Sequence, residues 1–178
     1  VDMEKYPESA ALTFQGKRSP RAMCPSYRGL GFTENPWLER VKATAATSSS
    51  VNLDDEVYLT SGVGPMICFC DRCIKRWDKW VASHQPDLAE ISPHDFFKRA
   101  HQYPQHYDAW VRFRCDLVAE RYGILREVFP AAVKQSGVTT TAEPEFGAFT
   151  GQERLVGLSS LEALSRTLDF ISPMIYED

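Results

Sequence analysis

Two groups of residues in this chain have types and spacings that support chemistry. Cys68, Cys70 and Cys73 form a C-x-C-x-x-C run, which begins twelve residues after the end of the acidic run Asp54-Asp55-Glu56. Thiolates at such short spacing are ligands that Zn²⁺ prefers. A carboxylate at the end of a strand is a candidate for acid/base chemistry. Together the two groups predict an active site at the end of a strand, beside a loop that a bound metal ion holds in place.

A structural zinc site needs a fourth ligand to complete its tetrahedron. Cys24 lies in a predicted loop and is the expected fourth ligand, whereas Cys115 lies inside a predicted helix and is expected to be a buried apolar residue. Two alternatives stay open for the cluster. Cys70 and Cys73 have the C-x-x-C spacing of a redox pair, and the cysteines could also be unliganded thiols.

The composition sets limits on partners and compartment. The 178 residues carry a net charge of −4, which suits one domain or part of a larger one and argues against nucleic acid as a partner. A membrane partner is not expected, because no apolar run reaches the ~18 residues of a span. A chain that starts at Val1 is not expected to start at its native residue. Zinc-binding thiolates must stay reduced, which favours a cytoplasmic setting.

The first half of the chain supplies the elements that must position these groups. Residues 1–35 contain repeated Pro and Gly and are predicted to be a long loop that carries the zinc ligand Cys24. Asn35-Pro36 predicts the start of a helix, whose apolar face is formed by Trp37, Leu38, Val41 and Ala45. Val51, Leu53 and Val57 alternate with polar residues and predict a short strand that ends in the acidic run.

The second half alternates helix and strand. Predicted helices begin at Asp71 and span 105–134 and 159–167, with a short one over 95–101 in the loop 85–105. Predicted strands cover 138–142 and 168–175, and Gly137 is expected to stop the long helix. This alternation predicts parallel strands joined by crossover helices.

Acidic residues follow each predicted strand. Glu143 and Glu145 follow the second strand, and Glu177 and Asp178 follow the third, as Asp54-Asp55-Glu56 follows the first. Because the carboxyl ends of parallel strands meet at one edge, the pattern predicts a carboxylate-lined cleft of the kind glycosidases use. A solvated loop or a salt-bridged structural acid is the alternative for the first run.

Taken in order, these motifs resemble a known family. Cys24-Pro25-Ser26, Asp54-Asp55-Glu56, the cysteine run and the later Trp77 and Trp80 resemble the middle of the family-42 β-galactosidases. Val138–Thr141 and Leu168–Ser172 resemble that family's fifth and sixth strands. The resemblance implies an α/β fold of the (β/α)8 TIM-barrel type, with residues 1–178 as a partial catalytic domain covering about strands 3 or 4 to 6.

The resemblance also implies roles for individual residues. Glu56 matches the general acid/base of a retaining mechanism, and Asp55 replaces the asparagine that binds the sugar. Glu143 and Tyr176, expected on the same rim, would contact the carbohydrate substrate. Cys24, Cys68, Cys70 and Cys73 would hold structural zinc. The nucleophile and the remainder of the barrel are expected beyond residue 178.

Other interpretations remain open at this point. A second interpretation is a barrel-derived protein that binds carbohydrate without hydrolysing it, which is suggested by the departure at Asp55 and by that of Thr141 from another asparagine of the family. A zinc-stabilised interaction module without a sugar site is a third interpretation, and a homo-oligomer is compatible with all three. Tyr27 and Trp80 are candidates for stacking on a sugar, whereas Trp77 is expected to pack in the core.

Overall fold

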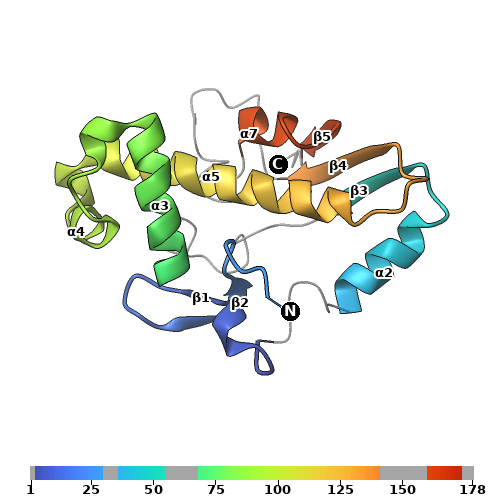
Figure 1. The fold of residues 1–178 in the computed structure, drawn as a ribbon, viewed down its shortest axis with the longest axis horizontal. Helices are drawn as coiled ribbons and strands as arrows, with labels where there is room; N and C mark the ends of the chain where they lie inside the picture. Colours follow the sequence, from blue (N-terminus) through green and yellow to red (C-terminus); the bar gives the residue numbers. More distant parts are fainter. Residues whose placement is uncertain (1–2, 30–35, 55–67, 141–159, 174–178) are drawn as a thin grey trace, which may run out of the picture.

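A computed structural model of the protein describes residues 3–29, 36–54, 68–140 and 160–173. Within these ranges the chain forms a parallel sheet with helices along it and a separate N-terminal hairpin (Figure 1). The apolar residues of both parts join one buried core.

The parallel sheet contains β3 (Ser50–Asp54), β4 (Gln135–Thr140) and β5 (Phe170–Pro173), in the spatial order β3-β4-β5. Leu53 pairs with Val138, which in turn pairs with Ile171. Leu53 and Val138 are buried and belong to the core. Both strand pairs are parallel, which confirms the predicted arrangement.

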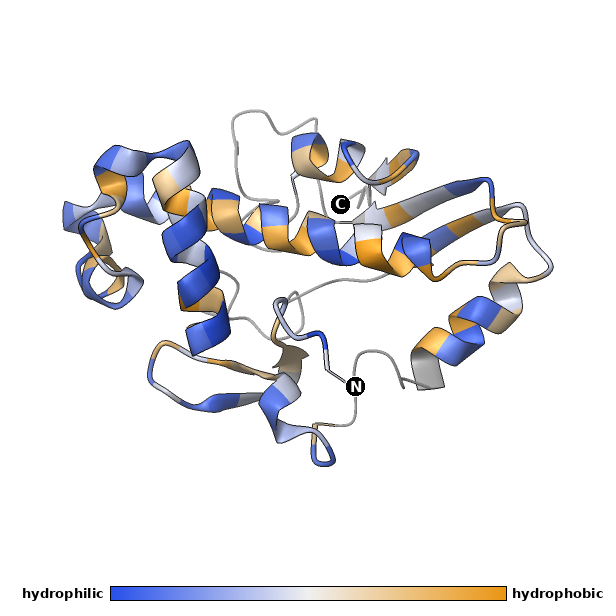
Figure 2. Ribbon diagram, viewed as in Figure 1, coloured by the Kyte–Doolittle hydropathy of each residue, from blue (hydrophilic) through white to orange (hydrophobic). Residues whose placement is uncertain are grey.

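Two long helices carry most of the core. α5 (Pro104–Glu127) runs alongside the parallel sheet, and α3 (Asp71–His84) leads from the N-terminal end of α5 to the hairpin (Figure 1). Both helices carry hydrophobic and hydrophilic residues along their length (Figure 2). The buried residues of α3 are Cys73, Trp77 and Val81, which recur every four positions and form one apolar face. Trp77 of α3 and Trp110 of α5 pack edge to face, with ring centroids 5.4 Å apart.

Shorter elements complete the part of the chain that the structure describes. They are α2 (Pro36–Ala45), α4 (Pro93–Lys98), α7 (Leu161–Ser165) and the 3-10 turns η1 (Pro7–Ser9), η4 (Pro86–Leu88) and η5 (Ala100–Gln102). Ser92 caps α4 by accepting a hydrogen bond from the Asp95 amide, and Ser160 caps α7 in the same way. None of the described helices combines the length and the apolar character that a membrane span needs.

The N-terminal hairpin pairs β1 (Ala10–Leu12) with β2 (Arg18–Met23) in antiparallel fashion. Gly16, with φ of 80°, allows the tight connection between the strands. The Phe69 amide donates to the Leu12 carbonyl at 2.8 Å, so the segment before α3 extends the hairpin by a backbone contact.

The expected (β/α)8 TIM-barrel type is wrong. Among the described strands, β3 and β5 each pair with β4 alone, which makes an open sheet of three strands. The second sheet is an antiparallel hairpin, a pairing that an all-parallel barrel does not contain. The physical reason is that alternating helices and strands specify parallel pairing without specifying closure, because open parallel sheets have the same alternation.

Several boundaries also differ from those predicted. The proline- and glycine-rich residues 1–35 contain a hairpin instead of a continuous loop. The long helix ends at Glu127, seven residues before the predicted end at Lys134, and β4 begins at Gln135 so that Gly137 lies inside a strand. The predicted helices at Pro36, at Asp71 and within 159–167 are confirmed within a few residues.

Candidate metal centre

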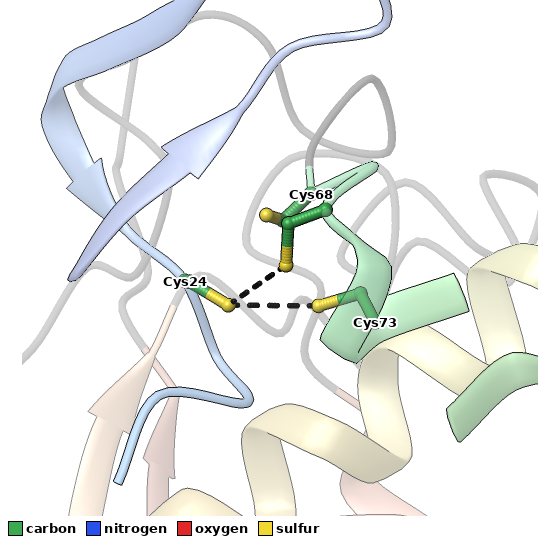
Figure 3. A group of neighbouring side chains, drawn as sticks. Cys24, Cys68 and Cys73 are labelled. Atoms are coloured by element: carbon green, nitrogen blue, oxygen red, sulfur yellow. Dashed lines mark hydrogen bonds between the residues drawn. The ribbon is translucent and has the colours of Figure 1, made fainter. Parts of the chain in front are cut away.

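The structure brings together the four cysteines that the sequence predicts as a group. The sulfur atoms of Cys24, Cys68, Cys70 and Cys73 all lie within 4.8 Å of one another. Cys24 Sγ is 3.5 Å from Cys70 Sγ and 3.6 Å from Cys73 Sγ. In a zinc tetrahedron with bonds of about 2.3 Å the sulfurs are about 3.8 Å apart, so this donor set fits Zn²⁺. Figure 3 shows the sulfur atoms of Cys24 and Cys73 directed toward each other.

Backbone hydrogen bonds on the hairpin side fix Cys24. It follows β2 directly, and its amide donates to the Ser9 carbonyl at 2.7 Å while its carbonyl accepts from the Tyr27 amide at 3.0 Å. Cys24 is fully buried. The turn that follows also brings Ser26 Oγ to 3.2 Å from Cys73 Sγ.

The start of α3 fixes the other three cysteines. Cys70 is the N-cap residue, with extended backbone, and its carbonyl accepts from the Ile74 amide at 3.0 Å. Cys73 lies in the first helical turn, where the helix dipole favours a thiolate. Cys68 precedes the helix, and its sulfur accepts a hydrogen bond from the Leu12 amide at 3.0 Å. The end of β2 and the start of α3 therefore meet at the cysteine cluster.

Contacts among the clustered thiols shift their pKa values in opposite directions. Hydrogen bonds from Cys24, Cys68 and Cys70, and then the charge of Arg114, hold the pKa of Cys73 well below its ordinary value in spite of burial. Hydrogen bonds from Cys24 and Cys68 lower the pKa of Cys70 to about 7. The bonds that Cys68 shares with the other three thiols, together with burial, raise the pKa of Cys68.

Arg114 is a residue of the site that was not predicted from the sequence. It lies in α5 and is fully buried, and its Nη1 atom is 3.7 Å from Cys73 Sγ. A signal was present in the sequence, since Arg114 stands four residues after Trp110 and three before Leu117, at the spacing of a buried helix face. A cation on such a face indicates an anion within the core.

Glu120 binds the hairpin side to both long helices. Its carboxylate, on α5, accepts a hydrogen bond from Arg28 at 2.9 Å and forms an ion pair with Arg76 of α3. Partial burial raises the pKa of Glu120, but the hydrogen bond and charge of Arg76, followed by those of Arg28, outweigh it and lower the pKa below its ordinary value. This network lies beside the segment that carries Cys24.

The aromatic residues considered for sugar stacking are engaged within the protein. Tyr27 is buried and donates to Glu8 at 3.0 Å, and Trp77 is part of the core as expected. The Trp80 ring stacks on Trp77 at 5.7 Å and on His84 at 4.6 Å. The Trp80 indole therefore stacks on two rings of the protein itself, and it also lines a hollow of about 310 Å³ between α3 and α5.

The carboxylates of that hollow are also engaged. Asp116 accepts a hydrogen bond from Trp80 Nε1 at 2.8 Å and lies 3.7 Å from Arg166. Glu120 forms ion pairs with Arg28 and Arg76. Both carboxylates of the hollow therefore have partners within the protein.

The predicted sugar-site residues lie outside the described ranges. These are Glu56, Asp55, Glu143 and Tyr176. Thr141, Glu145, Glu177 and Asp178 lie outside them as well.

A comparison of the chain with known protein families, curated proteins and solved structures finds no match.

Proposed function

We propose that Cys24, Cys68, Cys70 and Cys73 bind one Zn²⁺ ion as a structural centre. The observation that carries this proposal is the meeting of four thiol sulfurs within 4.8 Å, from two segments that are far apart in the sequence. When bound, zinc supplies four metal–sulfur bonds and keeps no open position for water or substrate. The centre therefore stabilises the fold and does not perform chemistry itself.

The centre would join the N-terminal hairpin to the start of α3. The contacts between these parts include the Phe69–Leu12 backbone bond and the Leu12 amide on Cys68. These two hydrogen bonds contribute roughly 1 kcal/mol each, and the apolar residues of both parts share one buried core. A structural zinc ion would add a larger contribution than the two hydrogen bonds, so we expect its removal to loosen the hairpin.

Cobalt substitution tests the ligand set. Tetrahedral Co²⁺ with four thiolates gives intense visible and sulfur-to-metal charge-transfer absorption, and the absorption should saturate at one Co²⁺ per chain and disappear on addition of Zn²⁺. Replacement of Cys24 by Ala should reduce the charge-transfer intensity. Unchanged spectra in Cys24→Ala would remove Cys24 from the ligand set.

We further propose that the chain is part of a retaining glycoside hydrolase in which Glu56 is the general acid/base. The specific observation that favours this function is the parallel, adjacent arrangement of β3, β4 and β5. Glu56, Glu143 and Tyr176 follow the last residues of these strands by two, three and three positions. Strands that run in parallel end at one edge, which is where ligands bind in α/β sheets.

In this proposal Glu56 performs the proton transfers and the other three residues bind the substrate. Glu56 protonates the glycosidic oxygen as the bond breaks and then deprotonates the water that releases the sugar. Asp55, Glu143 and Tyr176 orient the carbohydrate through hydrogen bonds. A β-galactoside is the nearest substrate class, and a second carboxylate, about 5–5.5 Å from Glu56, would act as the nucleophile.

Glu56→Gln, made in the complete protein with any flanking sequence, separates the alternatives. It should cut turnover of a natural glycan steeply and turnover of an activated aryl glycoside much less, because the activated leaving group needs no proton. Equal turnover of the natural glycan in both proteins would contradict the assignment. Carbohydrate binding without hydrolysis would favour a binding protein, and zinc without carbohydrate binding would favour an interaction module.

A further inference from the structure

Arg114 places a guanidinium group inside the core of the protein. The residue is fully buried on α5, between the buried residues Phe113 and Cys115. Its guanidinium carbon lies 5.8 Å from the ring centre of Trp110, and its Nη1 atom lies 3.7 Å from Cys73 Sγ. Burial of a cation is costly unless an anion compensates it. The thiol cluster is the source of negative charge that this contact reaches.

Four thiolates around one divalent ion make an anionic centre. The formal charge is −4 from the sulfurs and +2 from the metal, which leaves −2. Two of the sulfurs receive neutral hydrogen-bond partners, the Leu12 amide at Cys68 and the Ser26 hydroxyl at Cys73. A neutral donor reduces the electron density on sulfur but leaves the net charge unchanged, so a buried centre of this charge also requires a cation.

We propose that Arg114 is a positioning residue that compensates the charge of the metal–tetrathiolate centre through Cys73 and so raises the affinity for the divalent ion. This inference rests on the proposed zinc centre and adds the residue that makes a doubly negative cluster tolerable inside the core. Arg72, in the first turn of α3, also reaches the cluster, where its side chain hydrogen-bonds to Cys24, but it is exposed. Water screens the charge of an exposed cation, so the buried Arg114 compensates the charge of the centre more strongly.

Three substitutions at Arg114 separate charge from hydrogen bonding and from packing. Arg114→Lys keeps the charge, Arg114→Gln keeps a neutral donor, and Arg114→Met keeps apolar bulk alone. Arg112→Met is the matched control, because Arg112 lies on the same helix but is exposed and paired with Asp108 at 2.8 Å. Zinc affinity is measured by competition with a chelator in each protein, after circular dichroism confirms the helical content of the metal-loaded form.

We expect Arg114→Gln and Arg114→Met to bind zinc about ten- to a hundredfold more weakly than the parent, as is usual when a residue that supports a ligand is lost. Arg114→Lys should recover most of the affinity, and Arg112→Met should equal the parent. In the cobalt-loaded protein, loss of the cation should shift the sulfur-to-metal charge-transfer band to longer wavelength, because the sulfur electrons are then less stabilised. A purely structural role for Arg114 would leave this band unmoved.

Equal zinc affinity in Arg114→Gln and the parent would overturn the inference, and so would an Arg114→Lys protein no better than Arg114→Gln. If Arg114→Met does not fold, the comparison of the Lys and Gln proteins decides. A parent protein that takes up neither zinc nor cobalt would contradict the proposed centre itself, which is a different failure from unchanged affinity in the variants.

Discussion

The sulfur atoms of Cys24 and Cys73 lie 3.6 Å apart although the two residues are 49 positions apart in the chain. One follows a strand of the N-terminal hairpin and the other lies in the first turn of α3. Both are buried, so the contact forms only when the hairpin and the helix are both in place. The proposed binding of a metal by this cluster would therefore be coupled to the folding of these two parts.

Replacement of a cluster cysteine should cost much more stability than replacement of the buried cysteine outside it. Cys24→Ala removes a metal ligand and should lower the free energy of unfolding by at least about 3 kcal/mol, because metal binding contributes directly to folding. Cys115→Ala removes one buried sulfur from α5 and should cost about 1 kcal/mol. Denaturant unfolding with and without a chelator measures both.

The chelator supplies the control for this pair. It should destabilise the parent and Cys115→Ala proteins and leave Cys24→Ala unchanged. An equal response of all three proteins would show that the cluster does not use a metal for stability.

Acid should remove the contribution of Glu120. Its pKa is held below the ordinary value of 4.5, so its ion pairs stabilise the folded protein above that pH and are lost as the pH falls through the lowered pKa. Glu120→Gln should lower stability at pH 7 by about 1 kcal/mol or less, since the carboxylate is partly exposed. The difference between the two proteins should vanish at low pH.

Urea unfolding at a series of pH values checks this prediction. Any acid release of metal affects the parent and Glu120→Gln alike and cancels in the difference between them. Glu127→Gln, an exposed change on the same helix, should match the parent throughout. A difference that grows as the pH falls would have the wrong sign.

Glycine is required in β4 but not in α5. A side chain at Gly137 would collide with the ring and the carbonyl of Phe170 on β5, whereas at Gly123 it would meet Thr167 at an ordinary 3.5 Å. Gly137→Ala should therefore cost about 1–3 kcal/mol. Gly123→Ala should be neutral or stabilise by up to about 1 kcal/mol, because alanine favours helix. Thermal unfolding compares the two, and a stable Gly137→Ala protein would contradict the β4–β5 register.

Much of the local structure could be predicted because it depends on periodicity. The apolar spacing in α3 and α5, the alternation of apolar and polar residues in β3 and the β-branched run Val138–Thr140 in β4 indicate these elements without distant contacts. The hairpin was missed because its strands are short and Pro20 interrupts one of them. The barrel was predicted wrongly because closure of a sheet depends on long-range strand pairing, which helix and strand alternation does not encode.

The metal centre was the more predictable part of the site. Cysteine spacing within one loop and a single further cysteine in another specify a ligand set directly. The supporting groups could not be found in that way, because Ser26 and Arg114 reach Cys73 only through tertiary packing. For Glu56 the sequence predicts the role, and the assay on Glu56→Gln tests it.

Elemental analysis of the purified protein tests the central claim most directly. The protein is prepared without added metal and without a metal-binding tag, and zinc is measured per chain alongside Cys24→Ala and Cys115→Ala. We predict about one zinc per chain in the parent and in Cys115→Ala, and a large loss in Cys24→Ala. A parent protein with four free thiols in this cluster and no bound metal, and with stability that a chelator does not change, would contradict the account.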